Sequence, residues 1–305
     1  MQVRIKEGEI NLPDFLLVGA AKSGTTSLYQ YLKQHPQIYM SENKEPWFFS
    51  FADIYKEEVH NFSGKGDTVT DFMKYVNLFR GATNEQVVGE ASTVYLYLYE
   101  ETIKNIKKYH PNWKELKIII IIRDPSERAF SHYLNSVGDG SCNSSFEEEI
   151  EKWNIKQCSD LWNIIDYGFY YNQIKSYKDT FGQVKIYLFD DLEERSALLA
   201  QDLYRFLEVD TFFKPNTDLK YNVSGNSGKF LRKLIYKPNL IKKVVKTFLP
   251  IETRTKIKNN ILGKFAYKSN LENSQRKILK EIYKEDITKL QDLIDKDLTR
   301  WLRRN

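Results

Sequence analysis

The stretch Phe15-Leu-Leu-Val-Gly-Ala-Ala-Lys22-Ser-Gly-Thr-Thr-Ser27 runs from a short apolar strand through a loop into a helix. Further along the chain a second apolar strand, Ile118–Ile122, leads into Arg123-Asp-Pro-Ser-Glu-Arg-Ala-Phe-Ser131. Helix N-termini that follow buried strands present backbone N–H groups to phosphate. Together the two segments predict an α/β protein with two separate phosphate sites.

The first segment differs from the loop of nucleotide kinases. Gly19 and Gly24 have the spacing of G-x-x-x-x-G-K-[ST], but Thr25 stands where the lysine belongs. The lysine lies inside the loop, at Lys22. We therefore expect a phosphate held without the usual Mg²⁺ arrangement. The residues expected to hold it are Lys22, Ser23, Gly24, Thr25, Thr26 and Ser27.

The second segment predicts the other phosphate site. A guanidinium at Arg123 binds two phosphate oxygens and the Ser131 hydroxyl a third. The alternative is a surface arginine paired with Glu127. Asp124 has a sufficient structural role as the N-cap of a helix with Pro125 at its first position. Two sites without a metal aspartate indicate a nucleotide that carries phosphates at both ends.

Composition excludes several other classes. Hydrophobic content of 41% and charged content of 29% are ordinary for a soluble globular protein. The two cysteines, Cys142 and Cys158, exclude a disulfide scaffold, and neither has metal-ligand spacing with the four histidines. The apolar run Phe15–Ala21 is too short for a signal peptide or a membrane span, so we expect a cytoplasmic protein. From the spacing of the cysteines and histidines we expect no bound metal.

Strand and helix signals alternate along the chain. Strands are expected at 15–18, 87–88, 117–122 and 184–189, and helices at 25–34, 100–109, 126–136, 146–153, 170–180, 197–207 and 273–302. This order predicts a P-loop-like three-layer α/β sandwich, with a central, mostly parallel sheet flanked by helices. In such sheets ligands bind beyond the strand carboxyl ends. We expect a single domain over residues 1–305.

A basic, less regular segment lies at about residues 220–270. Between Lys229 and Lys268 twelve lysines and arginines accompany one acid, Glu252, while the whole chain has a net charge of +5. One interpretation is a helix pair with a solvated lysine face. The other is a basic lip that attracts an anionic acceptor or a membrane surface. We do not expect nucleic-acid binding, because no recognised module accompanies the patch.

In this combination the motifs resemble the PAPS-dependent sulfotransferases, in the branch of heparan-sulfate-type and many bacterial enzymes. The similarity spans residues 13–230, with a weaker echo in the final helix. The matching segments are Gly19–Tyr29, Leu32-x-x-His35-Pro36, Lys44–Phe49, Gly89-Glu90…Tyr95, Ile121–Tyr133, Tyr167…Gln173 and Asn222…Lys229. Where the animal glycan enzymes continue Gly-Glu with Lys-Thr-Pro, this chain has Ala91-Ser92-Thr93, which places it nearer the bacterial members.

The resemblance implies transfer of a sulfuryl group from 3′-phosphoadenosine 5′-phosphosulfate (PAPS) to a glycan or a polar small molecule, leaving PAP. It implies a covering loop at Asn222, Ser224, Gly225 and Lys229, and a role for Lys22 at the leaving oxygen. For the base that takes the acceptor proton we rank Glu45 first, Glu90 second and His132 third. His35 more plausibly caps the first helix.

Aromatic residues near the candidate bases predict the acceptor site. Lys44, Trp47, Phe49 and Tyr95 are the candidates, although most such rings serve as core. Two other functions stay open: a P-loop kinase or NTPase, and a non-catalytic nucleotide-binding protein at a membrane surface. The sequence identifies the donor better than the acceptor.

Overall fold

The computed structural model describes residues 2–5, 8–54, 68–83, 86–139, 141–155, 163–217, 226–227, 266–267 and 270–303. A five-stranded sheet of order β4-β5-β3-β6-β7, parallel throughout, forms its centre. Its strands are β3 (Phe15–Gly19), β4 (Ile38–Met40), β5 (Val87–Ala91), β6 (Lys117–Ile122) and β7 (Gln183–Leu188). Two smaller antiparallel pairs are β1 (Gln2–Ile5) with β2 (Gly8–Asn11) and β8 (Asn226–Ser227) with β9 (Ala266–Tyr267).

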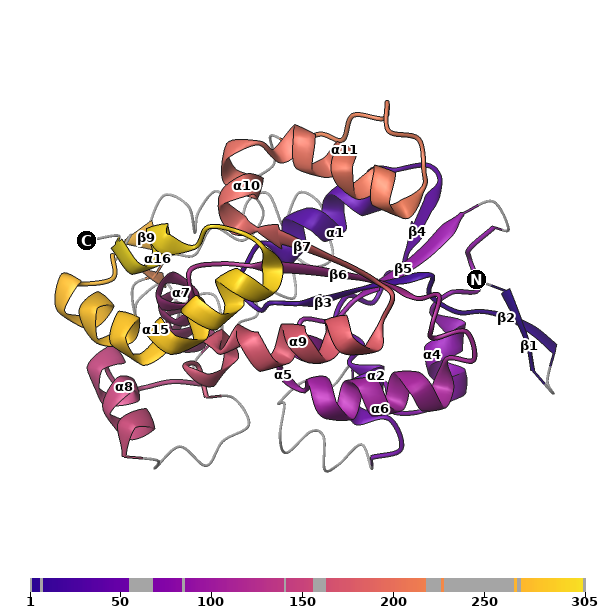
Figure 1. Cartoon of the computed structure of the whole chain (residues 1–305). Helices are drawn as coiled ribbons and strands as arrows, with labels where there is room; N and C mark the ends of the chain where they lie inside the picture. The colour runs from indigo at the N-terminus through magenta and orange to yellow at the C-terminus, as the bar shows by residue number, and fades with distance from the viewer. Residues whose placement is uncertain are drawn as a thin grey trace, which may run out of the picture.

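Helices cover both faces of the sheet, as Figure 1 shows. On one face lie α1 (Thr25–Gln34), α10 (Phe189–Glu194) and α11 (Ser196–Leu207). On the other lie α2 (Phe48–Phe51), α4 (Phe72–Asn77), α5 (Val94–Tyr97), α6 (Tyr99–Tyr109) and α9 (Tyr170–Thr180). The remaining elements are α7 (Pro125–Asp139), α8 (Phe146–Asn154), the 3₁₀ turn η1 (Asp166–Gly168), α15 (Asn273–Ile294) and α16 (Thr299–Arg303).

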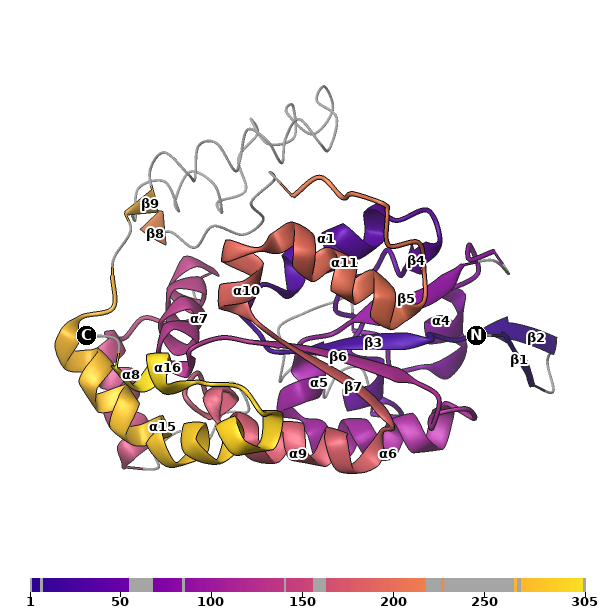
Figure 2. The same ribbon diagram turned by 45° about the horizontal axis from the view of Figure 1, so that its top comes forward.

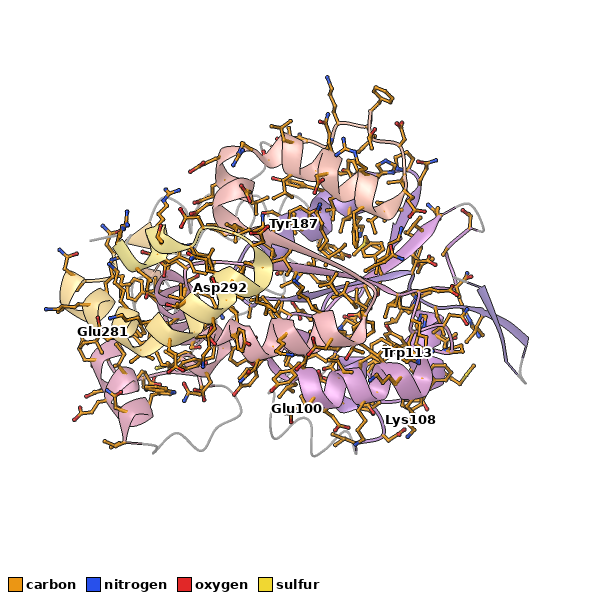
Figure 3. The ribbon with its side chains drawn as sticks, viewed as in Figure 1. Glu100, Lys108, Trp113, Tyr187, Glu281 and Asp292 are labelled. Atoms are coloured by element: carbon orange, nitrogen blue, oxygen red, sulfur yellow. The ribbon has the colours of Figure 1, made fainter. Side chains whose placement is uncertain are left out.

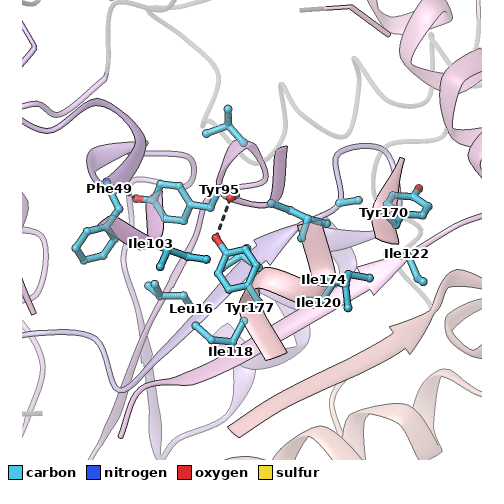
Figure 4. Close-up of a cluster of buried hydrophobic side chains, with 14 of the residues drawn as sticks. Leu16, Phe49, Tyr95, Ile103, Ile118, Ile120, Ile122, Tyr170, Ile174 and Tyr177 are labelled. Carbon is cyan, nitrogen blue, oxygen red and sulfur yellow. Dashed lines mark hydrogen bonds between the residues drawn. The ribbon is translucent and has the colours of Figure 1, made fainter. Parts of the chain in front are cut away.

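The isoleucine run of β6 divides the interior into two cores. Side chains alternate across a strand, so Ile119 and Ile121 face α1 and α11, while Ile118, Ile120 and Ile122 face α9. In Figure 4 Ile118 and Ile120 lie by Tyr177 and Ile174 of α9, and Ile122 lies nearer Tyr170. The same figure marks the hydrogen bond that Tyr177 donates to the carbonyl of Tyr95, at 2.8 Å. Charged side chains such as Lys108 and Glu281 lie on the outside (Figure 3).

One glycine of β5 leaves room for a side chain of the neighbouring strand β3. A Cβ on Gly89 would lie 2.1 Å from Cζ of Phe15 on the adjacent strand β3. Any other residue at this position would require the Phe15 ring to move. The segment directly after Gly89 carries Glu90, Ser92 and Thr93, so this close approach sets the position of three site residues.

The loops that follow β3 and β6 lie at the same edge of the sheet, where these parallel strands end. The loop after β3 leads into α1, Arg123 follows β6, and α7 begins directly after it. Helix α15 packs against both α7 and α9 at this end, and β8 lies against α7 (Figure 2). The two phosphate motifs therefore meet at the carboxyl edge, which confirms the expected α/β sandwich.

One expected helix is divided. Sequence periodicity predicts a continuous helix over 273–302, but α15 ends at Ile294 because Asp295 adopts a left-handed conformation, with φ of 51°. The chain then turns and forms α16, which buries Trp301. The expected strand at residues 184–189 ends one residue earlier, and Phe189 begins α10.

Candidate active site

The phosphate cradle lies between β3 and α1. Helix α1 begins at Thr25, and its first N–H groups face the loop before it. Gly24 has a φ of +93°, and a Cβ there would lie 2.5 Å from Leu192 of α10, so only glycine fits. Ser23 and Thr25 are buried beneath the loop, whereas Thr26 and Ser27 are half-buried. The cradle residues expected from the sequence thus come together.

Lys22 extends from the cradle towards α7. It also has a left-handed backbone, with φ of 68°. Its Nζ donates a hydrogen bond of 2.9 Å to Oδ1 of Asn135, which lies 113 residues further along the chain. Asn135 is exposed. An ammonium group is therefore held at the mouth of the cradle by a neutral partner.

Arg123 emerges at the end of β6, where the sequence placed the second phosphate site. Its guanidinium lies over the ring of Phe189, 4.5 Å from the centroid. The ion pair with Glu127 that the sequence left open as an alternative is present, but it is long, at 3.7 Å. Asp124 accepts a hydrogen bond of 2.9 Å from the Ser126 N–H, as the predicted cap. Burial raises the pKa of Asp124 above its usual value.

Helix α15 adds an arginine to this second site that sequence reasoning missed. Arg276 pairs with the other oxygen of Glu127 at 2.6 Å, so the Glu127 carboxylate bridges Arg276 and Arg123. Ser131 lies further along α7 and is buried. A lone arginine in a long amphipathic helix gave no sequence signal of its own, because its placement depends on how α15 packs against α7.

Glu45 accepts several hydrogen bonds in the segment after β4. Its carboxylate accepts from Lys44 Nζ at 2.8 Å, from Trp47 Nε1 at 3.0 Å and from the Thr93 backbone N–H at 2.7 Å. The Thr93 hydroxyl donates as well, at 3.1 Å. The Lys44 and Glu45 side chains are 22% and 13% exposed, so Lys44 is the partner that solvent reaches more readily.

Glu90 lies in a different environment from Glu45. It is fully buried on β5 and accepts hydrogen bonds from the hydroxyls of Ser92, Tyr95 and Tyr75, at 2.6, 3.0 and 3.1 Å. Burial raises its pKa to about 7, although these hydroxyl bonds oppose the shift. An acceptor molecule cannot reach a carboxylate that has no exposed surface.

His132 contacts the buried Arg128 of the same helix. Arg128 Nη1 donates to His132 Nδ1 at 3.3 Å, since a guanidinium has no acceptor atom. The imidazole proton is therefore on Nε2. Burial, Arg128 and Lys22 together hold the pKa of His132 well below its usual value. The ring is edge-on to Tyr167, with centroids 5.2 Å apart. His132 is thus a neutral hydrogen-bond donor.

A stacked pair of tyrosines links these groups. The rings of Tyr97 and Tyr167 stack at 3.8 Å, and η1, which carries Tyr167, packs against α7. Burial and the neighbouring Tyr97 raise the pKa of Tyr167, and the carboxylate of Glu45 contributes to the same shift. His132 and Tyr97 therefore both contact the ring of Tyr167.

The other expected site residues are placed differently. Phe49 and Tyr95 lie in the core, where an acceptor cannot contact them, and Trp47 is also buried. His35 ends α1, accepts the Gln37 N–H at Nδ1 and donates from Nε2 to the Asp210 carbonyl. Asn222, Ser224, Gly225 and Lys229 lie outside the described residues.

No helix in the described part of the chain is long and apolar enough to cross a membrane. Within the same residues, no group of three or more histidine, cysteine, aspartate or glutamate side chains is arranged to hold a metal ion.

Comparison with known proteins identifies relatives. The model of a family described as the sulfotransferase family matches residues 13–214. A solved sulfotransferase from Alicyclobacillus acidocaldarius is 31% identical, with a TM-score of 0.70, and the match covers 96% of this chain and 100% of that one.

Curated relatives match over shorter stretches. Membrane-associated sulfotransferase kil1 of Dictyostelium discoideum is 30% identical over 41% of this chain and 23% of its own length. Human heparan sulfate glucosamine 3-O-sulfotransferase 3A1 is 26% identical over 54% of this chain and 36% of its own. The matched region is thus well under half the length of these relatives.

Proposed function

The chain belongs to the sulfotransferase family, and on that premise we propose that it transfers a sulfuryl group from PAPS to an acceptor hydroxyl or amine. The observation that carries the proposal is the pair of phosphate sites at one sheet edge. The cradle with Lys22 suits a 5′-phosphosulfate, and Arg123 with Ser131 suits a 3′-phosphate. The acceptor proposed is a glycan or a polar small molecule.

Lys22 stabilises the leaving group in this proposal. Sulfuryl transfer breaks the bond between sulfur and the bridging oxygen of the 5′-phosphate, and it forms a bond from sulfur to the acceptor oxygen or nitrogen. Negative charge grows on the departing phosphate. We assign the neutralisation of that charge to the ammonium of Lys22 and the N–H groups at the start of α1, an assignment supported by the position of Lys22 in the loop that leads into α1.

Glu45 takes the acceptor proton. Its carboxylate is held at one oxygen by Trp47 and the Thr93 N–H, which fix its direction. The other oxygen accepts hydrogen bonds from Lys44, a half-buried lysine, and from the Thr93 hydroxyl. When Lys44 turns to the sulfuryl oxygens, that oxygen becomes available to the acceptor O–H. Lys44 thus pairs with the base before the acceptor binds, and it then places a positive charge beside the transferred group.

His132 donates a hydrogen bond instead of accepting the proton. Its Nδ1 is bonded to Arg128, and its Nε2 carries the proton. We propose that this N–H contacts the transferred group or the acceptor beside Lys22. Glu90 is fully buried and does not serve as the base.

The test combines binding with turnover. We expect PAP to bind in the absence of metal and much more tightly than 5′-AMP, because the 3′-phosphate adds charge-assisted hydrogen bonds. A screen with labelled PAPS over glycans, phenols, lipids and polar metabolites then identifies the acceptor. Equal affinity for PAP and 5′-AMP, or an absolute requirement for Mg²⁺, would contradict the proposal. A bacterial origin, a cytoplasmic location and membrane contact through residues 229–268 stay predictions.

A further inference from the structure

Glu90 is a buried carboxyl whose three donors are all hydroxyls. Ser92 donates to Oε1 at 2.6 Å, whereas Tyr95 and Tyr75 donate to Oε2 at 3.0 and 3.1 Å. None of the ion pairs among the described residues includes Glu90. A buried carboxyl without a cation is costly to ionise, so its presence at this place calls for a role.

Two of the three hydroxyls also accept hydrogen bonds from the segment that carries Glu45. The Ser92 hydroxyl accepts a hydrogen bond of 3.1 Å from the Trp47 N–H, and the Tyr95 hydroxyl accepts one of 3.1 Å from the Phe49 N–H. We call this pair of hydroxyls, Ser92 and Tyr95, the hydroxyl relay. Among the described hydrogen bonds, the Tyr75 hydroxyl makes none to this segment.

Trp47 connects the relay to Glu45. Its backbone N–H binds Ser92, and its indole Nε1 donates to Glu45 Oε2 at 3.0 Å. The segment needs such support, because the backbones of Glu45 and Trp47 both have a positive φ, 68° and 62°. Residues other than glycine rarely adopt such angles. The position of the Glu45 carboxylate thus depends on how Trp47 is held.

The ionisation state of Glu90 fixes the direction of the relay. A carboxylate only accepts, so Ser92 and Tyr95 must point their protons at it and keep their lone pairs for the two N–H groups. A protonated carboxyl, or a glutamine, adds a donor at this place. The hydroxyl that accepts from this new donor must then turn its own proton away, and where it is Ser92 or Tyr95 that proton turns towards the N–H that the hydroxyl now accepts.

We propose that Glu90 is a positioning residue: its carboxylate, acting through Ser92 and Tyr95, holds the Glu45 segment in place, and proton uptake by Glu90 loosens it. The role assigned to Glu45 rests on the proposed function. The coupling of Glu90 to Trp47 does not depend on it.

The titration of Glu90 falls near neutral pH. Burial raises its pKa to about 7; its hydroxyl partners oppose the shift and the Glu45 carboxylate adds to it. The other titratable groups that face it are Tyr75 of α4, Tyr95 of α5 and Tyr177 of α9. Burial raises the pKa of each of these tyrosines, so they stay protonated. The relay is therefore intact above about pH 7 and is lost as pH falls below it.

Trp47 supplies a readout that is independent of turnover. Its indole and backbone N–H resonances are measured by ¹H–¹⁵N NMR and assigned against Trp47→Phe. We expect both to titrate with a midpoint near pH 7 in the unmodified protein, and this titration to vanish in Glu90→Gln. Ser92→Ala should shift both resonances at all pH values. Tyr75→Phe is the matched control, because it removes a hydroxyl from Glu90 without touching the relay. It should keep the titration of both resonances but move the midpoint to higher pH, since one hydrogen bond that lowers the pKa of Glu90 is lost, and well above that midpoint it should leave both resonances nearly in place.

Turnover completes the test. Glu90→Gln should lower kcat at pH 8 by about 10- to 100-fold, as displacement of a catalytic group does, and should leave the KM for PAPS unchanged. The acidic limb of its pH–rate profile should disappear, while Tyr75→Phe keeps the limb, moved to higher pH, and keeps kcat on the plateau above it.

Three outcomes would overturn the inference: no Trp47 titration near pH 7 in the unmodified protein, a titration that persists in Glu90→Gln, or equal effects of Tyr75→Phe and Ser92→Ala. If PAPS is not turned over at all, the proposed function fails, and the NMR result still decides the coupling.

Discussion

Replacing Lys22 with alanine separates transition-state stabilisation from binding. In the structure its ammonium is anchored to Asn135 of α7 at 2.9 Å, so a positive charge is fixed at the mouth of the cradle before any ligand arrives. We expect Lys22→Ala to lower turnover by about 10²- to 10³-fold, the loss found when one preorganised donor to a developing charge is removed. PAP affinity should fall less, because the N–H groups at the start of α1 remain.

The same substitution should leave the fold almost unchanged. The lost hydrogen bond is to an exposed asparagine and is worth about 1 kcal/mol or less. Alanine also adopts the positive φ of residue 22 at a cost similar to that of lysine, so the backbone strain does not change. A fall in turnover without a fall in Tm therefore reports the missing charge.

The assay measures turnover of labelled PAPS with a confirmed acceptor, PAP affinity by calorimetry, and Tm. Lys33→Ala is the matched control, because it removes an exposed lysine from the last turn of α1, the same helix that the cradle precedes. It should leave turnover near normal. If Lys22→Ala kept its turnover while PAP binding collapsed, Lys22 would be an anchor for the nucleotide and the reasoning would be wrong.

Substitutions at four further residues test the remaining roles. Arg123→Ala should weaken PAP by about 1.5–3 kcal/mol in calorimetry but leave 5′-AMP unaffected; equal losses for both ligands would argue against a 3′-phosphate site. Glu45→Gln should lower kcat by about 10²- to 10⁴-fold with PAP binding intact, and near-normal turnover would exclude Glu45 as the base. His132→Gln, which keeps an N–H donor, should retain more turnover than His132→Leu, whereas a histidine base would make the two equally inactive. Glu90→Gln should flatten the pH dependence of unfolding in urea: since the pKa of Glu90 is raised from 4.5 to about 7, its stabilisation is full below pH 4.5 and is lost as pH rises through 7, a change of about 3 kcal/mol.

The elements that sequence predicted well are those with a strong local signal. The continuous β-branched run Lys117–Ile122 forms β6 with the same bounds, and the helix expected at residues 25–34 is α1. In contrast, β4 escaped prediction because three residues, Ile38–Met40, carry too little pattern and become a strand only by pairing with β5. The break at Asp295 escaped for a related reason: a left-handed aspartate leaves no periodic trace.

The site shows the same division between local and long-range information. The cradle and Arg123 are contiguous motifs, so the sequence placed them. The partner of Lys22 lies 113 residues away, and Arg276 reaches Glu127 from a helix near the end of the chain. Burial decides the rest: Glu45 and Glu90 look alike as sequence candidates, yet one is partly exposed and the other has no exposed surface.

The resting partners of the site cations explain how one structure is both ordered and ready to bind. Asn135 holds Lys22, Glu45 holds Lys44, and Glu127 holds Arg123. These contacts are exposed or only half-buried, so each contributes about 1 kcal/mol or less. They are strong enough to bias the side-chain rotamers, but a phosphate or sulfuryl group displaces them at small cost and gains charge-assisted hydrogen bonds in return. The ordering of the three cations is then largely complete before the donor binds, and such preorganised donors stabilise charge that develops in a transition state.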